Sequence, residues 1–191
     1  MASSIGQVRR MSGISKTTSR NVAVTLRRPT ARDADEFLRS VRRSRSLHKG
    51  LVSPPNTLER FREYTNGLRK KNREGFLVLS GDTGGLVGVV NVSEIVRGLF
   101  QSAYLGYYAF VPHAGRGEMR QGLRQVIQYC FLELKLHRLE ANIQPGNHRS
   151  AALVESLGFR LEGFSPGYLK VCGRWRDHQR WAILAQEWGG T

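Results

Sequence analysis

A glycine-bearing turn between a strand and a helix constrains the fold of this chain more than any other feature. Residues 103–110 form an apolar, aromatic run that predicts a strand, and the apolar residues of segment 119–134 recur with helical spacing. Between these segments, Gly115, Arg116 and Gly117 predict a tight turn. The turn has two interpretations. It is either a simple connection or a cradle in which backbone N–H groups and a helix N-terminus hold a phosphate or pyrophosphate.

The spacing of the other elements predicts one domain of the α/β (α+β) class, with a mixed sheet of about six or seven strands flanked by about four helices. The predicted strands cover residues 22–26, 76–79, 86–96, 103–110, 137–143, 159–169 and 176–184. The predicted helices cover residues 30–44, 57–68, 119–134 and 147–157. The folded domain is therefore expected to span residues 22–188.

The chain carries a large positive charge, with 30 Lys and Arg against 15 Asp and Glu, or +15. Residues 1–32 hold seven of the basic residues and no acidic one, which leaves a surplus of eight for the rest. This surplus favours anionic partners such as RNA or a ribosome surface and argues against strongly cationic small substrates. The alternative is that frequent arginine only reflects a GC-rich genome.

Residues 1–21 are rich in Ser, Thr and Arg and predict a disordered basic tail. A targeting segment, or Met11 as the true initiator, are the alternatives. No apolar run approaches the ~20 residues that span a membrane. Cys130 and Cys172 form no C-x-x-C pair, which is typical of a reduced, cytoplasmic protein.

Three motifs in the last third of the chain point to a family. They are Asn147-x-x-Ser150, Leu157-Gly158-Phe159 followed by Glu162-Gly163, and Gly173-x-Trp175-x-Asp177-His178. Together with the glycine turn, they make residues 22–188 similar to the Gcn5-related N-acetyltransferase (GNAT) superfamily. Within it, the chain resembles the ribosomal-protein N-alpha-acetyltransferase branch, the RimJ/RimL type.

The resemblance implies that acetyl-CoA is the cosubstrate and that no metal takes part. The pantetheine arm would pair with backbone groups near Phe110 and Val111, where two central strands separate, and an N–H near Val111 would face the thioester carbonyl. The expected cradle for the pyrophosphate consists of Ala114, Gly115, Arg116, Gly117 and Glu118. Further contacts to the arm are expected from Asn142, Asn147 and Ser150.

Two departures from the family pattern bear on this cradle. Pro112 stands where the family has Gln, Arg or Lys, and Gln121-Gly122 where it has Glu-Ala. Because Pro112 has neither charge nor N–H, we expect Arg116 to supply the missing charge.

For catalysis, the resemblance nominates Ser150 as the proton donor to the leaving thiolate, with Tyr168 as the second choice. A serine in the first turn of a helix can equally serve only backbone groups. The general base stays unassigned, because Gly167 occupies the position where some relatives carry a carboxylate. His178 beside Asp177 fits a structural pair better than a base, and His48 is a candidate contact to the acceptor.

The implied activity is transfer of an acetyl group from acetyl-CoA to an amine by direct attack in a ternary complex. The preferred acceptor is the N-terminal α-amine of a protein, possibly ribosomal, because its pKa of about 7.7–8.0 leaves it partly neutral at cell pH. A small amine or amino acid is the alternative acceptor. A non-catalytic ribosome- or RNA-binding protein with the same fold is the alternative of another class. The sequence leaves a monomer and a dimer open.

Overall fold

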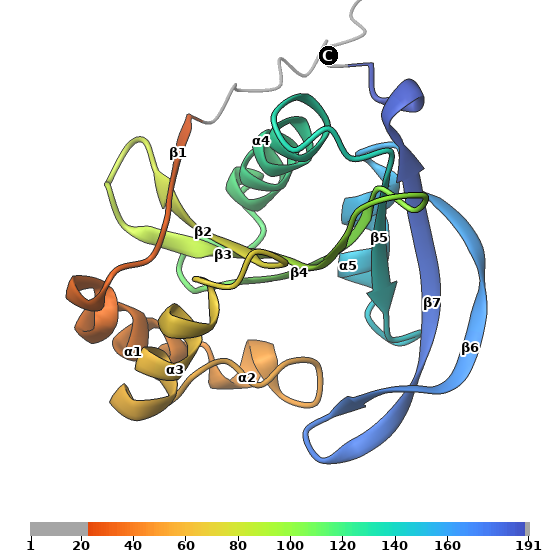
Figure 1. Cartoon of the computed structure of the whole chain (residues 1–191). Helices are drawn as coiled ribbons and strands as arrows, with labels where there is room; N and C mark the ends of the chain where they lie inside the picture. The colour runs from red at the N-terminus through yellow and green to blue at the C-terminus, as the bar shows by residue number, and fades with distance from the viewer. Residues whose placement is uncertain (1–22, 190–191) are drawn as a thin grey trace, which may run out of the picture.

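A single mixed sheet of seven strands organises the protein in a computed structural model that describes residues 23–189 (Figure 1). The strands are β1 (Val24–Arg27), β2 (Glu74–Ser80), β3 (Leu86–Val96), β4 (Ser102–Ala109), β5 (Arg138–Ile143), β6 (Arg160–Val171) and β7 (Arg174–Leu184). Their order across the sheet is β1-β2-β3-β4-β5-β7-β6. All neighbours run antiparallel except β4 and β5. The tail predicted for residues 1–21 lies outside the described residues.

Helices cover both faces of the sheet (Figure 1). They are α1 (Ala34–Arg43), α2 (Arg45–His48), α3 (Leu58–Gly67), α4 (Glu118–Leu132) and α5 (His148–Glu155), with short 3-10 turns at Ala31–Asp33 and Ala185–Glu187. Apolar residues of α4 and α5 form one buried cluster with the sheet, and those of α1 and α3 form a second. The sheet is therefore the middle of three layers.

The predicted class and mixed sheet are confirmed, with one helix more than expected among the described residues. The extra helix is α2, whose four residues are too few to show a helical period in the sequence. None of the described helices is both long and apolar enough to span a membrane.

The glycine turn and α4 connect the two parallel strands. Gly117 is the N-cap of α4 and has φ 85°, a conformation that favours glycine. The buried residues of α4 include the predicted apolar stripe from Met119 to Phe131, Cys130 among them. Burial raises the pKa of the Cys130 thiol to about 12, which leaves it protonated.

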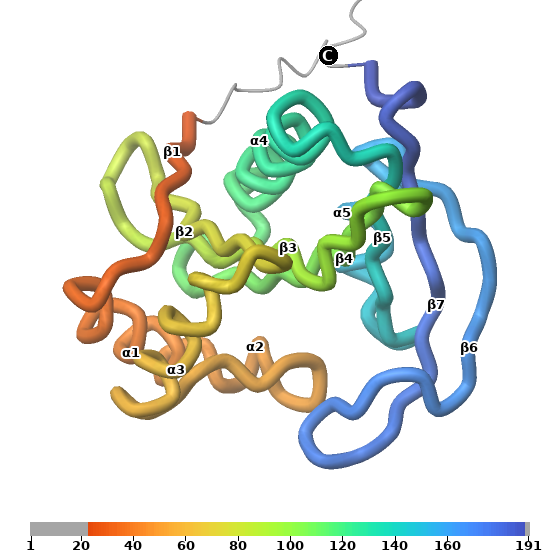
Figure 2. Tube along the Cα trace, viewed as in Figure 1, coloured from red at the N-terminus to blue at the C-terminus, as the bar shows by residue number. Residues whose placement is uncertain are grey.

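β4 and β5 pair only at their beginnings, where Ser102, Ala103 and Tyr104 face residues 138–140. Past Tyr104, no further pairing joins these strands in the described part of the chain. On the far side of β5, the turn between β6 and β7 reaches the segment after α2 (Figure 2), where Ser53 Oγ lies 3.2 Å from Cys172 Sγ. The sheet therefore has a gap in its middle that a hairpin and a loop flank.

Candidate functional site

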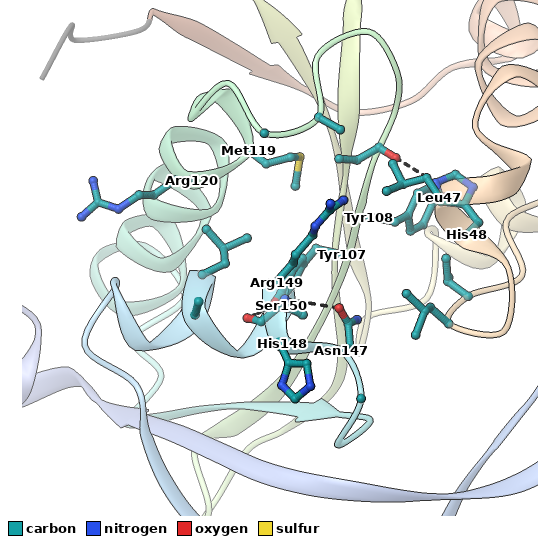
Figure 3. A pocket seen from close by; sticks show the side chains of 18 of the residues that line it. Leu47, His48, Tyr107, Tyr108, Met119, Arg120, Asn147, His148, Arg149 and Ser150 are labelled. Atoms are coloured by element: carbon teal, nitrogen blue, oxygen red, sulfur yellow. Dashed lines mark hydrogen bonds between the residues drawn. The ribbon is translucent and has the colours of Figure 1, made fainter.

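A cavity of about 1090 Å³ lies where β4 and β5 separate (Figure 3). Its lining residues fall within four segments: 46–52 on and after α2, 107–109 on β4, 114–120 around the start of α4, and 146–153 around α5. α2 lies on one face of the sheet, and α4 and α5 lie on the other. Residues from both layers of helices thus line the cavity.

Backbone groups of β4 face this gap. The Phe110 N–H donates to the Val87 carbonyl of β3 at 2.7 Å. Because successive residues of an antiparallel strand point their N–H and C=O groups to opposite sides, Tyr107 and Ala109 direct theirs away from β3. Tyr107 and Ala109 also line the cavity. They present the edge of an unpaired strand to a ligand.

The N–H groups of Phe110 and Val111 are not available for the pairing expected from the sequence. The Phe110 N–H is used by β3, and its carbonyl accepts the N–H groups of His113 and Ala114 at 3.1 and 3.0 Å. The Val111 N–H donates to the buried Ser44 Oγ at 3.0 Å. Neither residue lines the cavity. The Val111 N–H is occupied by Ser44, which lies 67 positions away in the sequence. The backbone groups that remain free for a ligand therefore lie earlier on β4.

The glycine turn forms an open cradle at the N-terminus of α4. Gly115 and Gly117 have φ angles of 84° and 85°, and a Cβ added to either would meet no atom within 4 Å. The N–H groups of Gly115, Gly117 and Glu118 make no backbone hydrogen bond within residues 23–189. Free N–H groups beside a helix N-terminus favour an anion.

The other two residues of the expected cradle contribute less. The Ala114 N–H donates to the Phe110 carbonyl at 3.0 Å, and the Arg116 N–H to the His113 carbonyl at 3.3 Å. Arg116 is exposed and does not line the cavity. The charge expected from Arg116 is therefore not directed into the site.

Arg149 brings positive charge into the cavity instead. Figure 3 shows its side chain reaching from α5 across the cavity toward Met119. No hydrogen bond or ion pair from Arg149 to another described residue is found. The sequence does not reveal that Arg149 lines the cavity, because nothing in the pattern around the Asn147 motif distinguishes it from other exposed arginines.

The Glu118 side chain faces the protein interior. Its carboxylate lies 2.8 Å from His113 Nδ1, and both side chains are buried. Glu118 therefore offers only its backbone N–H to a ligand. His113, which the sequence did not single out, fixes the carboxylate away from the cavity.

Ser150 lies on the cavity wall in contact with Tyr107. The Ser150 Oγ is 2.6 Å from the Tyr107 hydroxyl, which also donates to the Ser150 carbonyl at 3.1 Å. Burial raises the pKa of Tyr107 to about 12, so the phenol stays protonated. Asn147 caps α5 and accepts the Ser150 N–H at 3.3 Å. The sequence missed Tyr107, whose place in an apolar run is typical of a core residue.

Tyr168 lies away from the cavity. It stands on β6, hydrogen-bonded to Tyr104, and this bond contributes most to raising the pKa of Tyr104 to about 12. Its ring centroid is 6.3 Å from that of His178. Of the two proton donors nominated from the sequence, the fold brings only Ser150 to the cavity.

Three polar residues of β5 and β7 also stand apart from the cavity lining. Asn142 lies opposite Arg180 of β7, and its buried Oδ1 has no hydrogen-bond partner within the described residues. His178 Nδ1 lies 2.9 Å from the Arg176 carbonyl, and Asp177 accepts the Gly167 N–H at 2.7 Å. Asp177 and His178 thus bond to different partners and do not form the pair considered from the sequence.

His48 connects α2 to the unpaired edge of β4. Its Nε2 lies 2.8 Å from the Ala109 carbonyl, so Nε2 carries the hydrogen and donates it. The ring is buried against Tyr108 and Phe110, and burial lowers the pKa of His48. Nδ1 has no partner among the described residues. His48 is therefore neutral at neutral pH and lines the α2 side of the cavity.

The lining of the cavity is positively charged at one end, which we refer to below as the anion-binding end, and uncharged at the other. Arg149, the glycine cradle and the start of α5 form the first, and Leu47, His48 and Val52 belong to the second. No Asp or Glu is found among the described residues that line it. No group of three or more His, Cys, Asp or Glu residues within 23–189 is arranged to hold a metal ion.

Known proteins share this arrangement of strands and helices. The model of the acetyltransferase (GNAT) domain matches residues 23–160. A probable N-acetyltransferase of Bacillus subtilis, YjcK, is 39% identical over 66% of this chain and 70% of its own. The ribosomal protein uS5-alanine N-acetyltransferase of Escherichia coli is 40% identical over 54% of this chain and 53% of its own, about half its length. The structure of Mycobacterium smegmatis RimJ in complex with CoA-disulfide superposes with a TM-score of 0.80 at 28% identity, covering 87% of this chain and 84% of that one.

Proposed function

The chain belongs to the GNAT acetyltransferase family, and on that premise we propose that it transfers an acetyl group from acetyl-CoA to the N-terminal α-amine of a protein. The acceptor class we propose is a ribosomal protein, because the Escherichia coli relative is named for an alanine of ribosomal protein uS5. The reaction would take place in the cytoplasm, as the sequence predicts.

The anion-binding end of the cavity suits the CoA part of the cosubstrate. The free N–H groups of Gly115, Gly117 and Glu118, together with Arg149, would hold the pyrophosphate. The outward-facing N–H and C=O groups of Tyr107 would pair with the pantetheine arm as an added strand does, which leaves the Ala109 N–H for the thioester carbonyl. This assignment moves the pairing from Phe110 and Val111 to groups that are free.

The uncharged end is the observation that carries the choice of acceptor. Leu47, His48 and Val52 offer a neutral wall, and no carboxylate lines the cavity within the described residues. Such a wall suits an amine that enters uncharged. An N-terminal α-amine, with a pKa of about 7.7–8.0, is far more often neutral at pH 7.5 than a lysine, with a pKa of about 10.4.

The chemistry needs a small number of groups. The neutral amine attacks the thioester carbonyl, the carbon–sulfur bond breaks, and CoA leaves as a thiolate. The Ala109 N–H faces the gap and would stabilise the developing negative charge on the carbonyl oxygen. Ser150, held by the Tyr107 hydroxyl, would pass its proton to the thiolate and regain one from the proton that the amine releases.

A polyamine is a weaker candidate acceptor. Spermidine is the substrate for which one distant relative is named. A polycation needs carboxylates near its second amine, and the lining residues supply none. The chain's charge of +15 also repels it.

Steady-state thioester cleavage by the full chain tests the proposal. The acceptors are peptides that begin with Ala or Ser, the same peptides with a blocked N-terminus, and spermidine. We expect cleavage of acetyl-CoA with the free peptides and at least tenfold lower kcat/KM with spermidine. Higher kcat/KM for spermidine would overturn the acceptor class. Binding of acetyl-CoA without turnover of any amine would favour the non-catalytic alternative.

A further inference from the structure

About half of the protein's net positive charge lies in one layer. Residues 34–73 contain eleven Lys and Arg and four Asp and Glu, so they carry +7 of the chain's +15. Residues 74–189 are nearly balanced, with twelve basic and ten acidic residues. Residues 34–73 comprise α1, α2, α3 and the turn before β2, and we refer to them as the basic layer. Residues 1–33 carry another +6, so the surplus lies almost entirely in residues 1–73, and a genome-wide bias toward arginine would not leave the rest of the chain nearly balanced.

All eleven cations of the basic layer are exposed. Within the described residues, only Arg73 forms an ion pair, with Glu94 at 3.3 Å. Cations elsewhere are more often neutralised, as Arg138 and Arg160 are by their glutamate partners. The basic layer therefore presents positive charge that the described part of the protein leaves uncompensated.

The basic layer also adjoins the cavity. α1 contacts both α2 and α3, so the three helices form one continuous layer on their face of the sheet (Figure 1). α2 supplies Leu47 and His48 to the uncharged end of the cavity. A partner bound to the basic layer would lie beside the uncharged end of the cavity, which we assign to the acceptor.

We infer that the basic layer docks on the phosphate backbone of structured RNA. The inference rests on the proposed function only for what the docking would achieve. Docking on RNA would bring the N-terminus of a protein in an RNA-rich particle to the cavity. Eight of the eleven cations are arginines, whose planar guanidinium matches phosphate oxygens in a bidentate manner.

RNA fits the basic layer better than an anionic membrane does. A helix that lies on a membrane turns an apolar face outward beside its basic residues. Here Phe37, Val41 and Phe61 of α1 and α3 are buried, and Leu58 is the exposed large apolar residue of these two helices. The outer surface of the layer thus offers eleven cations and only two exposed large apolar residues, Leu51 and Leu58, rather than an apolar face.

Fluorescence anisotropy with a labelled 30-base-pair RNA hairpin, at 50, 100 and 200 mM KCl, tests this inference. The test variant of the full chain is Arg39→Gln/Arg42→Gln/Arg62→Gln, three exposed residues of the basic layer. The matched control, Lys135→Gln/Lys170→Gln/Arg174→Gln, removes the same charge from exposed positions outside it. A further variant lacks residues 1–21 and with them four basic residues.

We expect the test variant to raise the Kd at 100 mM KCl at least tenfold. The slope of log Kd against log salt concentration should flatten by about 0.7–0.9 for each phosphate that is no longer neutralised. The control should change the Kd less than twofold. Any effect of the tail deletion on the Kd should be independent of the effect of the test variant. Equal weakening in the test and control variants would overturn the inference, as would the absence of RNA binding at 50 mM KCl. Preferential binding to vesicles containing 30% phosphatidylserine would overturn it in favour of a membrane.

The same variants separate this inference from the proposed function. Acetylation of a free peptide does not need the basic layer, so the test variant should keep its kcat/KM for an Ala-initiated peptide within twofold. Loss of RNA binding with intact peptide acetylation supports the inference. RNA binding by a protein that acetylates no peptide would leave the docking surface in place and refute only the proposed acceptor.

Discussion

At the scale of single residues, two hydrogen-bonded side chains of the cavity wall, Tyr107 and Ser150, carry the proposed proton transfer. They come from β4 and α5, 43 positions apart, and meet at 2.6 Å. Because the Tyr107 hydroxyl also holds the Ser150 carbonyl, it fixes both the serine side chain and the start of α5. These contacts fix the position of the Ser150 Oγ on the cavity wall.

We predict that Ser150→Ala lowers kcat by about 10²-fold or more, with a smaller change in the KM for acetyl-CoA. A proton donor acts mainly in the transition state, whereas a binding contact acts in both states. Tyr107→Phe keeps the ring and removes only the hydroxyl, so it should lower kcat less. Tyr168→Phe, on β6 outside the cavity, should leave kcat within twofold. A larger decrease in Tyr168→Phe than in Ser150→Ala would assign the proton donor to Tyr168.

His48 gives the stability of the protein a defined pH dependence. Burial lowers the pKa of His48 in the folded protein below its ordinary value of 6.5. Between these two pKa values the unfolded chain binds a proton that the folded protein does not, so stability falls as the pH falls below about 6.5. The slope is at most about 1.4 kcal/mol per pH unit for one proton.

Urea unfolding at pH 7.5, 6.5 and 5.5 measures this effect. His48→Gln keeps a donor for the Ala109 carbonyl and does not titrate, so its free energy of unfolding should depend less on pH over this range. Parallel pH profiles for the variant and the wild type would show that His48 titrates normally in the folded protein.

At the scale of elements, the proposed binding of the pyrophosphate depends on the turn that leads into α4. An alanine at Gly117 would place a Cβ in the open cradle, on a backbone with φ 85°. We predict that Gly117→Ala weakens CoA binding at least tenfold in calorimetry. Gly84→Ala in the β2–β3 turn is the control, because Gly84 has φ 67° and equally open surroundings.

Both substitutions should lower the free energy of unfolding by about 1–2 kcal/mol, the cost of a left-handed alanine. Only Gly117→Ala should change the affinity for CoA. Unchanged affinity in folded Gly117→Ala would remove the pyrophosphate from this turn.

The contact of α4 with the sheet depends on Gly122. A Cβ at this position would lie 2.6 Å from Cγ1 of Val78, a buried and stiff side chain of β2. Overpacking of this kind costs about 1–3 kcal/mol, which outweighs the gain of about 1 kcal/mol in helix propensity. We therefore predict that Gly122→Ala lowers the free energy of unfolding.

Gly67→Ala in α3 is the matched control for thermal or urea unfolding. A Cβ at Gly67 would meet no atom within 4 Å, so only the propensity gain of up to about 1 kcal/mol should remain. Stabilisation by both substitutions would mean that β2 yields to the added methyl group.

At the scale of the whole molecule, most of the fold follows from local patterns, whereas the site does not. The apolar run of β4 and the helical spacing of α4 predict their elements because each signal is contained in a short, continuous segment. Which backbone groups are free depends on distant contacts, such as that of Ser44 with Val111. The sequence therefore predicts the glycine cradle and Ser150, but not Tyr107, Arg149 or the occupied Val111 N–H.

Central to the proposed function is that this cavity brings acetyl-CoA and a neutral α-amine together. The most direct test is tandem mass spectrometry of an Ala-initiated peptide with one internal lysine, after reaction with the full chain and ¹³C-labelled acetyl-CoA. We predict one label per peptide, on the alanine α-amine. A label on the lysine side chain, or no label with folded protein that binds CoA, would contradict the proposed function.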